Sequence, residues 1–99
     1  MNVTLFVSPM CDNCIVAEGA LNRLAEKYNL SVRTYWVNRD GQTGNLVAYD
    51  ENHNRVYCPD LPGVPALLSK NRLFVGRDCC EALQQELRLV NVSADLYLE

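Results

Sequence analysis

Two cysteines near the amino end, Cys11 and Cys14, have the residue type and spacing that most directly suggest chemistry. They follow a short apolar run, Val3–Val7, which ends at Ser8-Pro9. If a helix begins at Cys11, residues three apart lie on one face of its first turn, where their sulfur atoms are close enough to bond. A thiol there also lies beside unpaired backbone N–H groups and the positive end of the helix dipole, which stabilise the thiolate. The pattern predicts a dithiol that cycles between reduced and oxidised forms.

The composition limits the kind of protein that carries this dithiol. The chain has 99 residues, of which 48% are hydrophobic and 21% charged, and a net charge of -3. This length supports one modest core, so we expect a single domain over residues 1–99. We also expect the protein to act as a monomer. The nine basic residues are scattered between Arg23 and Arg88, which argues against a nucleic-acid partner. No stretch has the pattern of a membrane span or a secretory signal, so we expect a cytoplasmic protein without a membrane partner.

The elements that must position the dithiol follow from the hydrophobic pattern. Residues 2–7 are apolar and β-branched, which predicts a strand covered on both faces. The period becomes helical from Asp12 to Tyr28, and Asn29 ends this helix. A second strand is predicted over Ser31–Val37. Together these elements predict a βαβ unit with two parallel strands and a right-handed crossover.

Residues 38–62 begin with turn chemistry and show no sustained helical face. Two short runs, Leu46–Tyr49 and Arg55–Cys58, flank a polar stretch and predict a β-hairpin insertion, with a short helix over Asn45–Asp50 as the alternative. Further on, residues 65–69 and 73–75 predict an antiparallel hairpin joined by a tight polar link.

The last predicted element is a helix from about Cys79 to Val90. Asp78 precedes it as a helix cap, with Glu81 three residues later, which is the pattern of a capping box. Cys80, Leu83 and Leu87, together with Val90, supply its buried face. Residues 91–99 follow as a short tail.

The remaining cysteines and the single histidine suggest less chemistry. Cys80 lies on the buried face of the last helix, as a small hydrophobic residue would. Cys79 falls near the first helical position, where a thiolate is stabilised, so a reactive or glutathione-contacting role is an alternative to burial. Cys58 is interpreted as a half-buried residue, with an extra regulatory thiol as the alternative, and His53 as solvated surface.

The order of elements, with Cys-x-x-Cys at the first strand–helix junction and Val-Pro before the third main strand, resembles the thioredoxin superfamily. The chain looks most like the small glutaredoxins and the glutaredoxin-like hydrogen donors of ribonucleotide reductase. The matching stretches cover about two-thirds of the chain: Val3–Val7, Pro9–Cys14, Gly63–Leu68 and Phe74–Gly76. The resemblance implies an α/β thioredoxin fold, with βαβ and ββα halves around a central four-stranded mixed sheet. An irregular or hairpin insertion replaces the usual middle helix.

The resemblance also implies a role for each matching residue. Cys11 is the exposed nucleophile and Cys14 the more buried resolving thiol. Pro65 is a cis-proline packed against the pair, and the backbone of Val64 pairs with an extended substrate as an added strand would. At the start of the last helix, Arg77 and Asp78 are candidate substrate-binding residues, because a helix N-terminus with an arginine holds a carboxylate.

Two departures from the family pattern affect this prediction. Asp12 places a negative charge next to the nucleophile, opposing the helix dipole, so a less acidic thiol is expected than beside a basic neighbour. The Gly-Gly element that often accompanies glutathione binding is replaced by residues 76–79, Gly-Arg-Asp-Cys. Recycling by a thioredoxin-reductase-type flavoprotein is therefore favoured slightly over recycling by glutathione.

The resulting hypothesis is a thiol–disulfide oxidoreductase that reduces protein disulfides and needs no metal or prosthetic group, with glutathione or a flavoprotein as electron donor. One alternative is a zinc or iron–sulfur module in which Cys11 and Cys14 are joined by Cys58 or Cys79. A second is a non-catalytic thioredoxin-fold interaction domain whose insertion at 38–62 contacts a partner.

Overall fold

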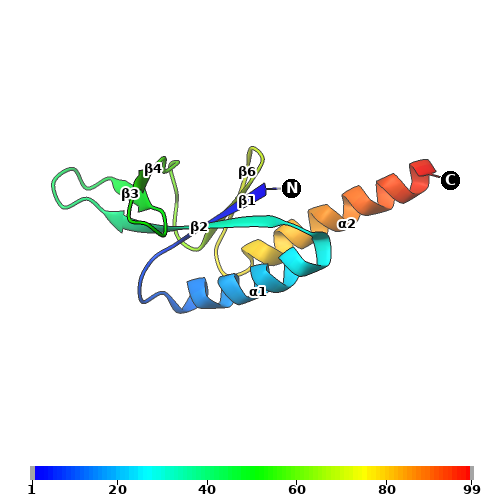
Figure 1. The fold of residues 1–99 in the computed structure, drawn as a ribbon, viewed down its shortest axis with the longest axis horizontal. Helices are drawn as coiled ribbons and strands as arrows, with labels where there is room; N and C mark the ends of the chain where they lie inside the picture. Colours follow the sequence, from blue (N-terminus) through cyan, green and yellow to red (C-terminus); the bar gives the residue numbers. More distant parts are fainter. Residues whose placement is uncertain (1, 99) are drawn as a thin grey trace.

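The computed structural model describes residues 2–98, with side chains described for residues 2–88. Within this part of the chain, six strands form one mixed sheet in the order β4-β3-β2-β1-β5-β6, accompanied by two helices (Figure 1). The predicted α/β class is confirmed, but the sheet has six strands and not four. The elements are β1 (Asn2–Val7), α1 (Asp12–Tyr28), β2 (Ser31–Arg39), β3 (Leu46–Tyr49), β4 (Arg55–Val56), β5 (Ala66–Ser69), β6 (Arg72–Val75) and α2 (Cys79–Leu98).

The first half of the chain forms the predicted βαβ unit, in which β1 and β2 are parallel. The predicted bounds of β1 and α1 are confirmed, and α1 ends where Asn29 adopts a left-handed conformation (φ 56°) and donates its backbone N–H to the carbonyl of Ala25. Strand β2 runs two residues past the predicted Val37, to Arg39. The extra length arises because Asn38 and Arg39 pair with β3, and backbone pairing does not require apolar side chains.

The predicted hairpin insertion is confirmed as β3 and β4, which pair antiparallel, but β4 ends at Val56 and not at the predicted Cys58. The alternative helix over residues 45–50 is wrong. Aspartate side chains stabilise the turn before β3 and the turn between β3 and β4. The Asp40 carboxylate accepts the backbone N–H of Gln42 at 2.8 Å, and this bond lowers the pKa of Asp40. The Asp50 carboxylate accepts the N–H groups of Asn52 and Asn54, each at 2.9 Å.

The last third contains the predicted hairpin, β5 and β6, closed by a two-residue turn in which Lys70 has φ 56°. Helix α2 continues to Leu98, so the predicted end at Val90 and the short tail are wrong. Residues 90–98 contain neither glycine nor proline, and nothing in them stops a helix. Neither helix of the described chain has the length and hydropathy that a membrane span requires.

The two faces of the sheet are covered differently. On one face, alternate residues of β1 pack against α1 and α2, which lie on the same side of the sheet in Figure 1. The buried side chains of α2 on this face include Cys80, Leu83 and Leu87, as predicted; the side chain of Val90 lies outside the described residues. On the other face, Phe6 packs with Leu61 and half-buried Cys58 from the segment that follows β4. That segment, and not a helix, covers this face within residues 2–88.

Candidate active site

Cys11 and Cys14 are joined by a disulfide at the N-terminus of α1, with their Cα atoms 5.2 Å apart. The chain leaves β1 at Val7, turns at Met10 (φ 57°) and enters the helix with Cys11 as the capping residue. The backbone N–H of Cys14 donates to the Cys11 sulfur at 3.2 Å. The same N–H is placed to stabilise a Cys11 thiolate once the disulfide is reduced.

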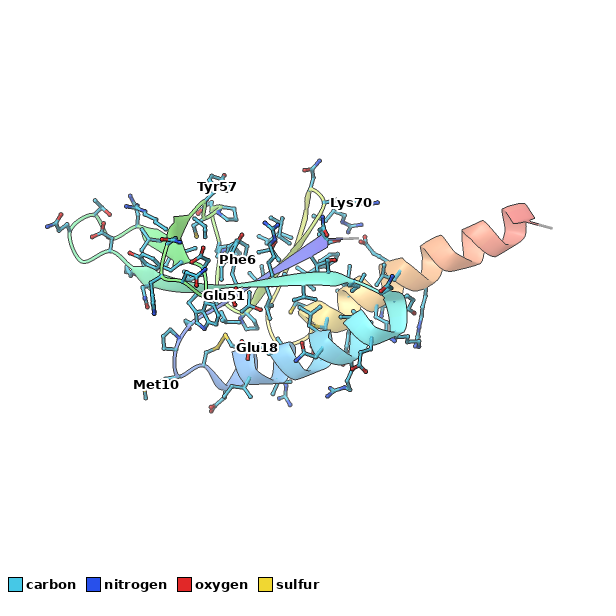
Figure 2. All side chains as sticks on the ribbon, viewed as in Figure 1. Phe6, Met10, Glu18, Glu51, Tyr57 and Lys70 are labelled. Atoms are coloured by element: carbon cyan, nitrogen blue, oxygen red, sulfur yellow. A yellow bond between two sulfur atoms is a disulfide. The ribbon has the colours of Figure 1, made fainter. Side chains whose placement is uncertain are left out.

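The two sulfurs differ in their access to solvent. Cys14 is 2% exposed and belongs to the core beneath the helices, whereas Cys11 is only half-buried and packs at the edge of that core. Around Cys11, the side chains of Met10, Asp12 and Asn13 are exposed, and Figure 2 shows Met10 projecting from the loop into solvent. An incoming disulfide therefore reaches Cys11 and not Cys14.

The Val64–Pro65 peptide bond is cis, as the resemblance implied. Ala66 lies opposite Phe6 in the sheet, so this dipeptide is at the same end of the sheet as the loop that carries the dithiol. Pro65 is buried, and its carbonyl accepts the backbone N–H of Gly76 at 2.8 Å. Cys11 and Val64 both pack against the core that contains Cys14.

Val64 also faces a groove of about 440 Å³. The groove runs from Pro9, two residues before Cys11, to Arg39 of β2 and Leu46 of β3. Among the turn and loop hydrogen bonds of the described residues, none involves the backbone of Val64. An extended peptide in this groove would therefore find an unpaired backbone beside the dithiol.

Arg77 and Asp78 are exposed in the turn between β6 and α2. This turn begins at Gly76 (φ 100°), whose carbonyl accepts the N–H of Cys79 at 3.1 Å. Because Gly76 is hydrogen-bonded to Pro65, the predicted substrate-binding residues Arg77 and Asp78 lie at the same end of the sheet as the dithiol. The predicted capping box is not formed, since the side-chain hydrogen bonds of residues 2–88 include none from Asp78 or Glu81.

The other three cysteines are free thiols. Cys79 and Cys80 are only 1% and 4% exposed, and the Cys80 thiol donates to the carbonyl of Ala17 on α1 at 3.3 Å. The hydrogen bond with Cys79 and burial together raise the pKa of Cys80. This burial does not support a reactive or glutathione-contacting role for Cys79. Cys58 is half-buried, donates to the carbonyl of Pro59, and has its pKa raised by burial.

The sequence did not predict some of the residues that line the groove, or a neighbouring pocket. Arg39 and Leu46 line the groove because β2 and β3 pair in the register that sets these two residues opposite each other. The same register sets Trp36 opposite Tyr49, and both side chains line a pocket that also contains Pro9. The signal that could have found them was the hairpin prediction, which lacked the full length of β2 and placed the end of β4 two residues too late.

Within residues 2–88, no three His, Cys, Asp or Glu side chains come together as a group that could hold a metal ion. The disulfide, the cis-proline and the groove lie together at one end of the sheet. Comparison with protein-family models, with curated proteins and with solved structures finds no match for this chain.

Proposed function

We propose that this chain is a glutaredoxin-like thiol–disulfide oxidoreductase with a thioredoxin fold, which reduces protein disulfides through Cys11 and Cys14. The observation that carries the proposal is the asymmetric dithiol at the N-terminus of α1. Its outer sulfur, on Cys11, is partly exposed, and its inner sulfur, on Cys14, is buried one turn behind. The cis Val64–Pro65 bond at the same end of the sheet supports it.

The arrangement of the inner strands supports the fold assignment. In the order β2-β1-β5-β6, β1 is parallel to β2 and antiparallel to β5, and β6 is antiparallel to β5. With both helices on one face, this is the arrangement expected for a βαβ half followed by a ββα half. The β3–β4 hairpin then stands where the middle helix of the family is expected.

The first step of the reaction takes place at Cys11. Its thiolate, stabilised by the Cys14 N–H and the helix N-terminus, attacks one sulfur of the substrate disulfide. A bond forms between that sulfur and Cys11 as the substrate S–S bond breaks. The departing substrate sulfur leaves as a thiolate and takes a proton from solvent. The product is a mixed disulfide.

The second step takes place at Cys14. After losing its proton, Cys14 attacks the Cys11 sulfur, which lies one helical turn away, and the mixed disulfide breaks. The second substrate thiol is released, and the Cys11–Cys14 disulfide seen in the structure is left. The substrate gains two electrons and two protons, which the dithiol loses. Because Cys14 is buried, it meets only a substrate already attached to Cys11.

Recycling needs two electrons, which either two glutathione molecules or a flavoprotein reductase supply. The substitution of the Gly-Gly element by residues 76–79, which includes the buried Cys79, favours the reductase. A dithiol of this kind is kept recharged in the reducing cytoplasm. We propose that the protein acts there, as a monomer, without a bound cofactor.

The test is turnover of a disulfide-bonded peptide, with NADPH consumption coupled in one arm to glutathione and its reductase and in the other to thioredoxin reductase. We expect turnover in at least one arm, faster with thioredoxin reductase. Cys11→Ser should abolish turnover, whereas Cys58→Ser, a matched change of a half-buried thiol, should leave it unchanged. Equal turnover by Cys11→Ser and the wild type would contradict the proposal.

A further inference from the structure

A second pocket lies beside the dithiol loop, on the side of the sheet that α1 covers. Its volume is about 300 Å³, and Pro9, Trp36 and Tyr49 contribute to its walls. Trp36 is the register partner both of Val7, which packs against the helices, and of Tyr49. The two aromatic side chains therefore share one face of the sheet and lie directly opposite each other. Trp36 remains 37% exposed.

The rim of this pocket is acidic. Asp50 and Glu51 line it, and both also line an adjoining pocket of about 480 Å³ that includes Trp36 and Glu18 of α1. Glu51, from the loop between β3 and β4, and Glu18, from α1, both line the adjoining pocket; Figure 2 labels both. Arg33 is the basic residue that lines the adjoining pocket, and His53 lines the first.

These carboxylates are free to meet a positive charge. Within residues 2–88, the salt bridge present joins Arg72 to Glu86, so Glu18, Asp50 and Glu51 are not ion-paired. One Asp50 oxygen accepts the backbone N–H groups of Asn52 and Asn54, which fixes the carboxylate in the loop. A fixed carboxylate loses little conformational entropy when a cation binds.

The pocket is also close enough to the dithiol to act on the same substrate. Pro9 is two residues before Cys11, so their Cα atoms are at most about 7 Å apart. Glu18, which lines the adjoining pocket, lies one helical turn after Cys14 on the same face of α1. A substrate whose cysteine is bonded to Cys11 can therefore place residues near that cysteine at the mouth of the pocket.

We propose that this pocket binds the side chain of an arginine located within a few residues of the reactive cysteine of the protein substrate. The inference rests on the proposed oxidoreductase function and adds a substrate class to it. A guanidinium group stacks on aromatic rings and pairs with carboxylates in a planar geometry. Trp36 and Tyr49 supply aromatic rings on which the guanidinium stacks, and Asp50 and Glu51 supply the negative charge that pairs with it. A substrate with an acidic residue in place of this arginine is repelled by the same carboxylates.

The test compares three disulfide-bonded peptides that differ only in the residue two positions from the cysteine: arginine, glutamine or glutamate. For the wild type, we expect kcat/KM to fall in that order, with arginine exceeding glutamate by about tenfold. Glu51→Lys should remove or reverse this order. Glu26→Lys makes the same charge change at the far end of α1, on an exposed side chain, and should keep it.

Two further measurements separate this inference from the proposed function. A small neutral disulfide should be reduced equally by the wild type and Glu51→Lys, because it does not reach the pocket. Trp36 is the only tryptophan in the chain, so its fluorescence reports binding of an arginine peptide in which the cysteines are replaced by serine. We expect a saturable change with the arginine peptide that is weaker with the glutamate peptide.

The outcomes are distinct. If the wild type reduces the small disulfide but shows the same kcat/KM for all three peptides, the pocket inference is overturned and the oxidoreductase function stands. If Glu51→Lys and Glu26→Lys alter the peptide order equally, the effect comes from net charge and the pocket inference is also overturned. If the wild type reduces no disulfide, the proposed function fails, whatever the fluorescence shows.

Discussion

Each helix of the described chain begins beside two cysteines: α1 at Cys11 and Cys14, and α2 at Cys79 and Cys80. The first pair is three residues apart, bonded, and reachable from solvent through Cys11. The second pair is adjacent in sequence, unbonded and buried. Both pairs lie near the positive end of a helix dipole, so the dipole alone does not decide which thiol reacts.

The chain segments before the two helices explain the difference. The loop before α1 projects outward through the fully exposed Met10, which leaves Cys11 at the surface. In the turn before α2, Gly76 is hydrogen-bonded to the Pro65 carbonyl, and the Cys80 thiol is hydrogen-bonded to the Ala17 carbonyl of α1. The second pair therefore lies between the helices. Solvent access therefore distinguishes the bonded pair from the core pair at otherwise similar positions, and we propose that it is what makes Cys11 the redox thiol.

The largest expected difference is in alkylation of the reduced native protein. Cys79 and Cys80 react only when the contact between α1 and α2 opens, so we expect iodoacetamide to label Cys11 at least about a hundredfold faster than either of them. The measurement is a time course of labelling, with each cysteine followed by peptide mass spectrometry. Labelling of Cys79 as fast as Cys11 would contradict the comparison.

The burial of the second pair can be tested through the core that encloses it. Leu83, one turn after Cys79, is completely buried. Leu83→Ala should lower the free energy of unfolding by about 2–5 kcal/mol and speed labelling of Cys80. The measurement is chemical denaturation of the reduced protein. Gln85→Ala, on an exposed position of the same helix, is the matched control and should change stability by less than about 0.5 kcal/mol.

Cys58 provides an intermediate case between the two pairs. It is half-buried, and burial raises its pKa. A raised pKa means a smaller thiolate fraction at neutral pH, so its labelling should be slow at pH 7 and should still increase above about pH 8.5, where an unperturbed thiol is already half ionised. Labelling rates measured from pH 6 to pH 10 test this expectation. A plateau below pH 8.5 would show that burial does not control this thiol.

The smallest expected effect concerns the charge next to Cys11. Asp12 is exposed in the first turn of α1 and opposes the thiolate. Asp12→Asn should therefore speed alkylation of Cys11 at pH 7 by about twofold to fivefold, the equivalent of a typical helix-terminus charge effect. Glu26→Gln, near the other end of the same helix, should leave the rate unchanged. An equal increase in both variants would point to net charge and not to position.

Local sequence patterns predicted the parts of the fold that local chemistry determines. Strand β1, helix α1 with its end at Asn29, and the β3–β4 hairpin follow from hydrophobic period, turn residues and β-propensity. The length of β2 and the six-stranded sheet were missed, because Asn38 and Arg39 join a strand only through pairing with residues further along the chain. The end of α2 was missed because no residue after Val90 marks a stop.

The candidate site likewise has features that the local sequence predicted and features that it did not. The spacing of Cys11 and Cys14 was enough to predict that their sulfurs meet, and the family resemblance supplied the cis bond at Pro65. Sequence alone did not place Trp36 opposite Tyr49, or Pro9 and Arg39 around one groove, because both arrangements depend on sheet register and on where a loop crosses the end of the sheet. The burial of Cys79 likewise depends on how α2 packs against α1.

The most direct test of the proposed redox role of Cys11 is to trap its bond to a substrate. The reduced Cys14→Ser protein, which lacks the resolving thiol, is mixed with a disulfide-bonded peptide, quenched with acid and digested for mass spectrometry. We predict a mixed disulfide at Cys11 and none at Cys58, Cys79 or Cys80. An adduct at another cysteine, or no adduct while wild-type protein turns over the same peptide, would contradict the account.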